Sequence, residues 1–260
     1  MPGDPAREYA AKEHALSFRD VTKTYVRSHL GRTSRFRGIE HLDLDLRPGE
    51  IFGLLGLNGS GKTTTIKLAL GLLAPTSGSV SIFGHPAGSR SALALMGYLP
   101  ELPYFYPYLT PREILTFYGR LSGMPHKELE AKTSRSLEKT GIERHTDRRM
   151  SDFSKGMLQR VGMAQALLHE PRLLLLDEPV SGLDPLAVAE FRALFSRLNQ
   201  EGTSLLLSSH SISEVERLCH RAGILVEGRL VKIFEQKDWS KEPGLLETLF
   251  VDMIRQNGAE

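Results

Sequence analysis

Gly56-Leu-Asn-Gly-Ser-Gly-Lys-Thr63 is the stretch that decides the fold of this 260-residue chain. An all-apolar run at residues 51–55 precedes it, and residues 63–73 follow it with the apolar spacing of a buried helix. Two glycines followed by Lys62 and Thr63, placed between a strand and a helix, are typical of a loop that cradles phosphates. The stretch therefore predicts an α/β fold with a P-loop nucleotide-binding core.

The chemistry of such a loop assigns a role to most of its residues. Its glycines let successive backbone N–H groups turn toward phosphate oxygens, and the following helix directs its positive end at them. Lys62 is expected to reach the β and γ phosphates, and the Thr63 hydroxyl to hold magnesium. The candidate nucleotide-binding residues here are Asn58, Gly59, Ser60, Gly61, Lys62, Thr63 and Thr64. The loop alone leaves kinases, GTPases, helicases and transport ATPases open, because it recognises phosphates and not a reaction.

Two adjacent acids, Asp177 and Glu178, end the apolar run that starts at Leu173. Acids in this position place Asp177 near the magnesium ion and Glu178 where it can polarise a water in line with the γ phosphate. Seen alone, acids after a strand also cap turns. Together with the Lys62 loop they favour nucleotide hydrolysis.

The rest of the chain predicts an antiparallel β edge, a parallel sheet and a helical insertion. Apolar and polar residues alternate at 16–21 and 42–46, as in half-buried strands. Between them, residues 27–37 carry four arginines and a glycine and are interpreted as a loop. A solvated hairpin loop is the favoured reading of this segment, and contact with lipid headgroups is the alternative. Further strands are predicted at 78–82, 96–99, 172–177, 204–208 and 224–226.

Residues 111–169 show no convincing strand, and Thr110-Pro111-Arg112-Glu113 resembles a capped helix start. We therefore expect an inserted helical lobe at about residues 100–170. Residues 245–254 are amphipathic and are expected to form a helix docked on the core of the chain, with a partner-binding helix as the alternative. The predicted organisation is a flexible segment at 1–15, one ATPase domain at 16–233 and a helical tail at 234–260.

Composition limits the partners and the location. With 33 basic and 31 acidic residues, the formal charge of +2 gives no reason to expect nucleic-acid binding. The aliphatic runs fall far short of the roughly 20 residues that cross a bilayer, and the N-terminus lacks the features of a secretory signal. We therefore expect a cytoplasmic protein. The single cysteine, Cys219, is expected to be a buried core thiol.

Further motifs, in a fixed order along the chain, carry a family resemblance. Phe153-Ser-Lys-Gly-Met-Leu-Gln-Arg160 resembles the signature motif of ABC ATPases, in which a helix N-terminus faces a phosphate. Ser181-Gly-Leu-Asp184 resembles the D-loop of that family, and Ser208-Ser-His210 its switch histidine. Gly97-Tyr-Leu-Pro-Glu101 resembles the segment that joins the γ phosphate region to the permease-facing lobe. Tyr25 matches the aromatic residue that stacks on adenine, and the resemblance covers residues 16–233.

The resemblance implies an ATP-hydrolysing subunit of an ABC transporter. ATP would stack on Tyr25, and Thr63 and Asp177 would share Mg²⁺. Ser154 and Gly156 of a second subunit would close over the γ phosphate, with Asp184 in the neighbouring D-loop. Hydrolysis would require Glu178, His210 and Lys62.

The implied partners are an integral-membrane permease and a second copy of the chain or a paralogous ATPase subunit. These place the protein peripherally on the inner face of the cell membrane. Lys155 and Met157 replace the glycine and glutamine usual in the signature, and Glu101 stands where glutamine is commoner. These variants and the Leu246-Glu-x-x-Phe250 tail resemble the branch that serves separate exporter-type permeases. The alternative is a soluble ABC ATPase that acts on protein or ribonucleoprotein assembly.

Overall fold

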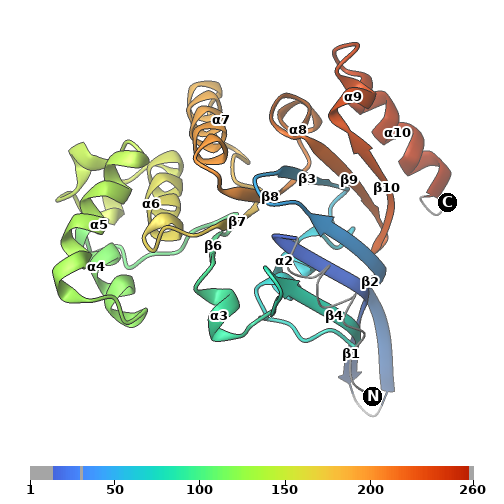
Figure 1. The fold of residues 1–260 in the computed structure, drawn as a ribbon, viewed down its shortest axis with the longest axis horizontal. Helices are drawn as coiled ribbons and strands as arrows, with labels where there is room; N and C mark the ends of the chain where they lie inside the picture. Colours follow the sequence, from blue (N-terminus) through green and yellow to red (C-terminus); the bar gives the residue numbers. More distant parts are fainter. Residues whose placement is uncertain (1–13, 30–31, 258–260) are drawn as a thin grey trace.

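The computed structural model describes residues 14–29 and 32–257, and its centre is a six-stranded sheet (Figure 1). The strand order is β10-β9-β3-β8-β7-β6, in which β9, β3, β8, β7 and β6 run parallel and β10 is antiparallel to β9. The strands are β3 (Ile51–Leu55), β6 (Met96–Leu99), β7 (Leu173–Asp177), β8 (Ser204–Ser209), β9 (Arg221–Val226) and β10 (Arg229–Glu235). The predicted parallel sheet is confirmed, whereas β10 was not predicted.

A second sheet of four strands, in the order β2-β1-β4-β5, forms the antiparallel edge. Its strands are β1 (Leu16–His29), β2 (Arg32–Leu46), β4 (Ser77–Ile82) and β5 (His85–Pro86). The interpretation of residues 27–37 as a loop is wrong over most of that segment, because β1 and β2 continue their ladder through Arg27↔Ser34 to His29↔Arg32. Backbone hydrogen bonds between two strands do not depend on apolar side chains, so an arginine-rich composition did not prevent pairing.

Helices cover the central sheet and join it to the second one (Figure 1). They are α2 (Lys62–Ala69), α3 (Arg90–Leu93), α7 (Pro185–Gln200), α8 (Ile212–Leu218), α9 (Gln236–Trp239) and α10 (Leu245–Asn257). Ile66 and Leu68 of α2 lie in the core that the two sheets share, and Phe191 and Phe195 of α7 lie in a second core. Within the described ranges, no helix combines the length and the apolarity needed to cross a membrane.

The C-terminal helix α10 packs on this second core. Leu246 is fully buried there, and Leu249 and Phe250 pack against it. The prediction that this amphipathic segment docks on its own chain is confirmed. Cys219 lies in the same core, where burial raises the pKa of its thiol.

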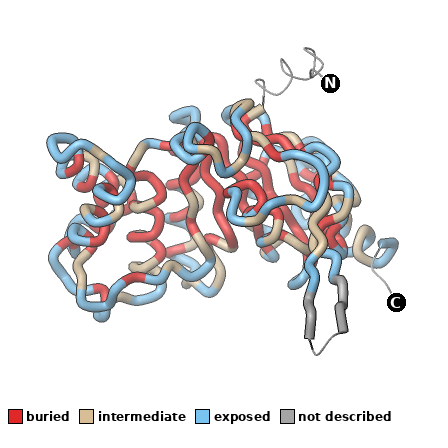
Figure 2. Tube along the Cα trace, turned by 90° about the horizontal axis from the view of Figure 1, so that it is seen from below, coloured by how far each residue is buried: buried red, intermediate tan, exposed pale blue. Residues whose placement is uncertain are grey.

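The stretch between β6 and β7 is helical and has a core of its own. It contains α4 (Pro111–Leu121), α5 (His126–Lys139), α6 (Lys155–Leu167) and two short 3₁₀ turns, Glu143–His145 and Met150–Asp152. Thr110 caps α4 in the predicted reciprocal arrangement with Glu113. Ile114, Leu137 and Val161 are buried in this separate core. Figure 2 shows buried trace in this helical part as well as in the sheets, and we call α4–α6 the helical lobe.

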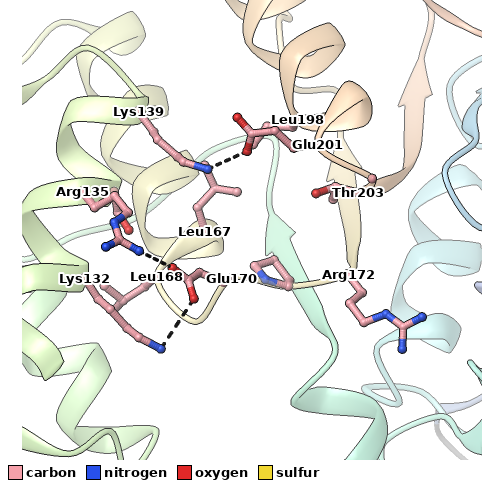
Figure 3. A pocket seen from close by; sticks show the side chains of 13 residues that line it. Lys132, Arg135, Lys139, Leu167, Leu168, Glu170, Arg172, Leu198, Glu201 and Thr203 are labelled. Carbon is pink, nitrogen blue, oxygen red and sulfur yellow. Dashed lines mark hydrogen bonds and ion pairs between the residues drawn. The ribbon is translucent and has the colours of Figure 1, made fainter.

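A cleft of about 310 Å³ marks the seam between the helical lobe and the core (Figure 3). Lys139 of α5 pairs with Glu201 at 2.7 Å, and Arg135 pairs with Glu170 at 2.9 Å. Arg172 stacks its guanidinium 4.2 Å from the ring centroid of Phe83 and points away from the other cations. Because these cations are already engaged, the seam holds the lobe against the core and does not form an anion site.

Candidate functional site

The loop between β3 and α2 has a backbone conformation that requires glycine at several positions. Gly59 and Gly61 have φ values of 82° and 111°. A Cβ atom on Gly56 would lie 2.3 Å from Ser60 Oγ, and one on Gly61 would lie 2.8 Å from the carbonyl oxygen of Gly38. The loop is therefore wound tightly enough for its backbone to approach a ligand closely.

Two features of this loop fit a bound phosphate chain. No side chain caps the N-terminus of α2, so its first N–H groups are left for an anion. The buried hydroxyl of Ser60 has no hydrogen-bond partner within the described part of the chain. Orphaned donors and a positive helix end in one small cradle are what phosphate oxygens require.

Lys62 lies at the bottom of the cradle with its side chain almost fully buried. Its Nζ donates to the carbonyl oxygen of Gly56 at 2.8 Å and lies 3.5 Å from Oε1 of Glu178. The ammonium group is thus placed between the loop and the acid at the end of β7. A cation held there is positioned to neutralise phosphate charge.

Asp177 occupies the last position of β7 and is buried behind the loop. Thr63 Oγ1 donates to Asp177 Oδ1 at 3.3 Å, and the fully buried Ser208 donates to the same oxygen at 2.6 Å. Ser208 Oγ also accepts the backbone N–H of Glu178 at 3.0 Å. The sequence indicated Ser208 only as part of the motif that ends in His210. Its contacts arise because the parallel strands β7 and β8 place Asp177 beside Ser208.

A hydroxyl and a carboxylate are hard oxygen donors that suit Mg²⁺. Thr63 and Asp177 supply these two groups side by side. The described ranges contain no cluster of three or more His, Cys, Asp and Glu side chains suited to a metal. A magnesium ion that takes most of its ligands from phosphates and water needs no such cluster, so the donor pair fits this ion.

Glu178 and His210 meet at the edge of the same sheet. Oε2 of Glu178 lies 2.7 Å from Nδ1 of His210 and accepts the His210 backbone N–H at 3.3 Å. Glu178 adopts a φ of 47°, in the left-handed region that a residue with a side chain rarely visits. Such backbone strain is concentrated at functional sites, where the surrounding structure fixes it.

The predicted residues converge on one cleft of about 470 Å³, a volume in the usual range for a ligand pocket. The predicted residues that line it are Tyr25, Asn58, Gly59, Gly61, Lys62, Thr63, Thr64, Glu101, Glu178 and His210. Four lining residues were not predicted as site residues: Arg37, Gly38, Leu57 and Ser181. Ser60 is buried within the loop, and Asp177 lies behind Thr63.

Comparison with known proteins identifies the family. The profile of the ABC transporter family matches residues 39–181. The bacitracin transport ATP-binding protein BcrA of Bacillus licheniformis is 41% identical over 216 residues, which are 82% of this chain and 67% of that protein. The chain belongs to the ABC transporter family.

Other relatives in the ABC transporter family carry related names. The Nod factor export ATP-binding protein I of Paraburkholderia xenovorans is 37% identical over 84% of this chain and 70% of its own length. An uncharacterized ABC transporter ATP-binding protein of Synechocystis is 37% identical, and the matched stretch covers 85% of this chain and 65% of that relative. The chain thus spans about two thirds of the length of the curated relatives that it matches.

Solved structures show the same fold. The ATP-binding subunit of an ABC transporter superposes with a TM-score of 0.77 at 31% identity, covering 92% of this chain and 99% of that chain. A dimeric post-hydrolysis structure of the ATP-binding cassette MJ0796 with ADP and Pi superposes with a TM-score of 0.76 at 23% identity, covering 86% and 100% of the two chains. The fold is that of an ABC ATPase cassette with a P-loop core, as predicted.

Three residues of the ABC transporter resemblance do not line the cleft. Ser154 caps α6 and accepts the N–H of Met157 at 3.3 Å, with Gly156 in the first turn of that helix. Asp184 caps α7 and accepts the N–H of Ala187 at 2.9 Å. Within one chain, Ser154 and Asp184 are the N-caps of α6 and α7, Gly156 lies in the first turn of α6, and none of the three lines the cleft.

Proposed function

We propose that this protein is the ATP-binding and ATP-hydrolysing subunit of an ABC transporter that powers movement of a substrate through a separate permease. The single observation that carries the proposal is the convergence of Lys62, Glu178 and His210 on the cleft formed by the phosphate loop. Lys62 comes from the start of α2, directly after the phosphate loop, and the other two come from the carboxyl ends of β7 and β8. Ligands of open α/β sheets bind at this edge.

ATP occupies the cleft with its adenine on Tyr25. The ring of Tyr25 lies against Gly38, where a Cβ atom would come within 2.6 Å of it, and the Tyr25 hydroxyl shares a hydrogen bond of 3.2 Å with Thr64 Oγ1. Asn58 and the loop glycines surround the phosphates, and Lys62 neutralises the β and γ oxygens. Glu101 lines the cleft just after the end of β6, where the chain leaves the sheet for the helical lobe.

Hydrolysis uses Glu178 as general base. Its carboxylate orients a water toward the γ phosphate and takes up the proton of that water as its oxygen bonds to the γ phosphorus and the bond to the leaving ADP breaks. His210 fixes the orientation of that carboxylate through the contact at Nδ1. Thr63 and Asp177 would hold Mg²⁺, which would supply charge neutralisation to the phosphates.

Two subunits enclose the nucleotide. We infer that Ser154 and Gly156 of one subunit complete the site of the other, with Asp184 in the adjoining loop. The position of these residues outside their own cleft supports this arrangement. The pair is either two copies of this chain or this chain with a paralogous ATPase.

An exposed aromatic patch supports a permease as the membrane partner. The patch comprises Tyr104, Tyr106, Tyr108 and Phe117, and their exposed fractions run from 41% to 86%. It starts three residues after Glu101, which lines the ATP cleft, so a protein bound to the patch would be coupled to the nucleotide. The ring of Tyr106 lies beside those of Tyr108 and Phe117, and exposed aromatic side chains that adjoin one another mark interaction sites.

This partner would place the protein peripherally on the inner, cytoplasmic face of the membrane. The name of the Nod factor export relative supports an exporter-type permease, and that of the bacitracin transport relative supports a transport function.

The proposed domain organisation follows the predicted one. The proposed ATPase domain is residues 16–233 with the helical lobe at about 100–170 inserted, and the proposed helical tail is residues 234–260, whose described part holds the end of β10 followed by α9 and α10. The proposed N-terminal flexible segment, 1–15, lies almost wholly outside the described residues.

The test of this function is Mg²⁺-dependent ATP hydrolysis by the purified chain, measured as phosphate release. Lys62→Ala should abolish turnover while the thermal unfolding midpoint stays near that of the wild type, because the lysine neutralises phosphates and adds little to the apolar core. Copurification of the tagged chain from membranes with a polytopic protein tests the permease partner. Full turnover in Lys62→Ala, or recovery of the chain only with soluble assemblies, would contradict the proposal.

A further inference from the structure

Gln159 of α6 makes a buried hydrogen bond that crosses from the helical lobe to the catalytic turn. Its side chain is 1% exposed, and its Nε2 donates to the carbonyl oxygen of Pro179 at 2.9 Å. Pro179 directly follows Glu178. The amide therefore contacts the residue that follows the proposed general base.

The turn that carries Glu178 is held from two sides. On the side of the central sheet, Ser208 accepts the Glu178 N–H at 3.0 Å. On the side of the lobe, Gln159 donates to the Pro179 carbonyl. Within the turn, the Ser181 N–H donates to the Glu178 carbonyl at 3.1 Å, and Pro179 has no N–H to offer.

The helix that carries Gln159 also carries the signature segment. Ser154 and Gly156 lie at the start of α6, and Gln159 lies in its second turn. A displacement of the start of α6 moves Gln159 with it, because a helix is a stiff element. The Nε2 donor then transfers that displacement to the strained backbone at Glu178.

We propose that Gln159 is a positioning residue that couples the signature segment to the general base of the same chain. A nucleotide bound by the second subunit engages Ser154 and Gly156, and Gln159 relays this engagement to Glu178. The inference rests on the proposed function, because it requires the two-subunit site. In a dimer, the side chain of Gln159 would thus link the nucleotide that Ser154 and Gly156 engage to the nucleotide that Glu178 of the same chain hydrolyses.

The amide acts through its N–H donor. Oε1 of Gln159 is buried without a hydrogen-bond partner among the described residues. Methionine matches glutamine in length and is accommodated in apolar surroundings, but it donates no hydrogen bond. Gln159→Met therefore removes the link and keeps the packing, and Gln165→Met on the same helix is the matched control.

The first experiment measures steady-state ATP hydrolysis, the affinity for a fluorescent ATP analogue and the unfolding midpoint in both variants. Gln159→Met should lower kcat about tenfold or more, because a small displacement of a catalytic group has effects of this size. Its affinity for the analogue should stay within about twofold of the wild type, since Gln159 lies outside the cleft. Gln165→Met should match the wild type. An unchanged kcat in Gln159→Met, or a parallel loss of kcat and analogue affinity, would overturn the proposal.

The second experiment uses Gln159→Glu, which keeps the shape and replaces the amide with a titratable acid. A protonated carboxyl donates its O–H to the Pro179 carbonyl, whereas an ionised one repels it. The ratio of its kcat to that of the wild type at the same pH should rise as the pH falls. A ratio independent of pH would overturn the role of the donor.

The third experiment is a double-mutant cycle with Ser154→Ala. Because Gln159 is proposed to relay what Ser154 engages, the loss in the double variant should be smaller than the product of the two single losses. Independent, multiplicative losses would contradict the coupling. Failure of the proposed function itself is separate, since it would appear as wild-type protein without Mg²⁺-dependent hydrolysis.

Discussion

Nδ1 of His210 lies 2.7 Å from Oε2 of Glu178, and both residues line the same cleft. The histidine side chain is 59% exposed, whereas that of Glu178 is 11% exposed. We therefore assign to His210 the role of orienting the Glu178 carboxylate. The buried carboxylate is the proposed base, and the contact from the exposed imidazole restrains it.

His210→Ala should lower kcat by about a hundredfold or more, because general-base catalysis contributes factors of this order and the carboxylate loses its restraint. Affinity for ATP should change little, as measured with a fluorescent analogue. A variant that hydrolyses ATP at the wild-type rate would place the orienting group elsewhere.

Ser208→Ala should reduce hydrolysis about tenfold and raise the Mg²⁺ concentration needed for half-maximal rate. The hydroxyl holds Asp177 Oδ1 at 2.6 Å and the Glu178 N–H at 3.0 Å, and groups that orient metal ligands have effects of this size. The matched control is Ser204→Ala, which removes a buried hydroxyl that bonds Gly49 at the other end of β8. Equal activity losses in both variants would show that stability, and not the orientation of the acids, is the cause.

Glu101→Ala should weaken permease-stimulated turnover more than the basal rate of the isolated subunit. Glu101 lines the cleft at the point where the chain passes into the helical lobe and the aromatic patch. Phosphate release with and without the reconstituted permease measures both rates. Equal losses in the two assays would indicate a direct role in hydrolysis.

Acid should destabilise the protein partly through His169. Burial lowers the pKa of His169, outweighing its hydrogen bond to the Met96 carbonyl, so the folded state resists protonation. The unfolded chain binds that proton near pH 6.5. The contribution of His169 to the free energy of unfolding is therefore complete above this pH and is lost as the pH falls below it. The free energy of unfolding can be measured with urea between about pH 5 and pH 8, the range in which histidine changes its charge. As the pH falls, this free energy should decline less steeply for His169→Gln than for the wild type. Parallel curves would contradict this assignment.

The sequence predicted those parts of the site whose residues are neighbours along the chain. The phosphate loop is recognisable because its glycines, Lys62 and Thr63 are contiguous and bind one ligand with their own backbone. Asp177 and Glu178 are recognisable because they are adjacent in sequence and directly follow four leucines. The capping box at Thr110 and the docked helix α10 were also predictable, since both depend on spacing within a single element.

Contacts between distant segments could not be predicted in this way. The role of Ser208 depends on the register of two parallel strands, and that of Gln159 on how α6 packs beside the turn after β7. Residues 27–37 were interpreted as a loop because arginine and glycine seldom favour strands, whereas the ladder between β1 and β2 continues through them. The backbone pairing of β1 with β2, and not the local composition, determines the structure of that segment.

The most direct test of the account is the mass of the Glu178→Gln variant with ATP and Mg²⁺, measured by size-exclusion chromatography with light scattering. The substitution keeps the shape of Glu178 but removes its negative charge and its ability to accept the water's proton, so closure becomes easier and hydrolysis stops. The account predicts a stable ATP-bound dimer, a mainly monomeric protein without nucleotide, and loss of the dimer when Ser154→Ala or Gly156→Asp is added. A Glu178→Gln protein that stays monomeric at saturating ATP and Mg²⁺, alone and when mixed with a candidate paralogous subunit, would contradict the composite site.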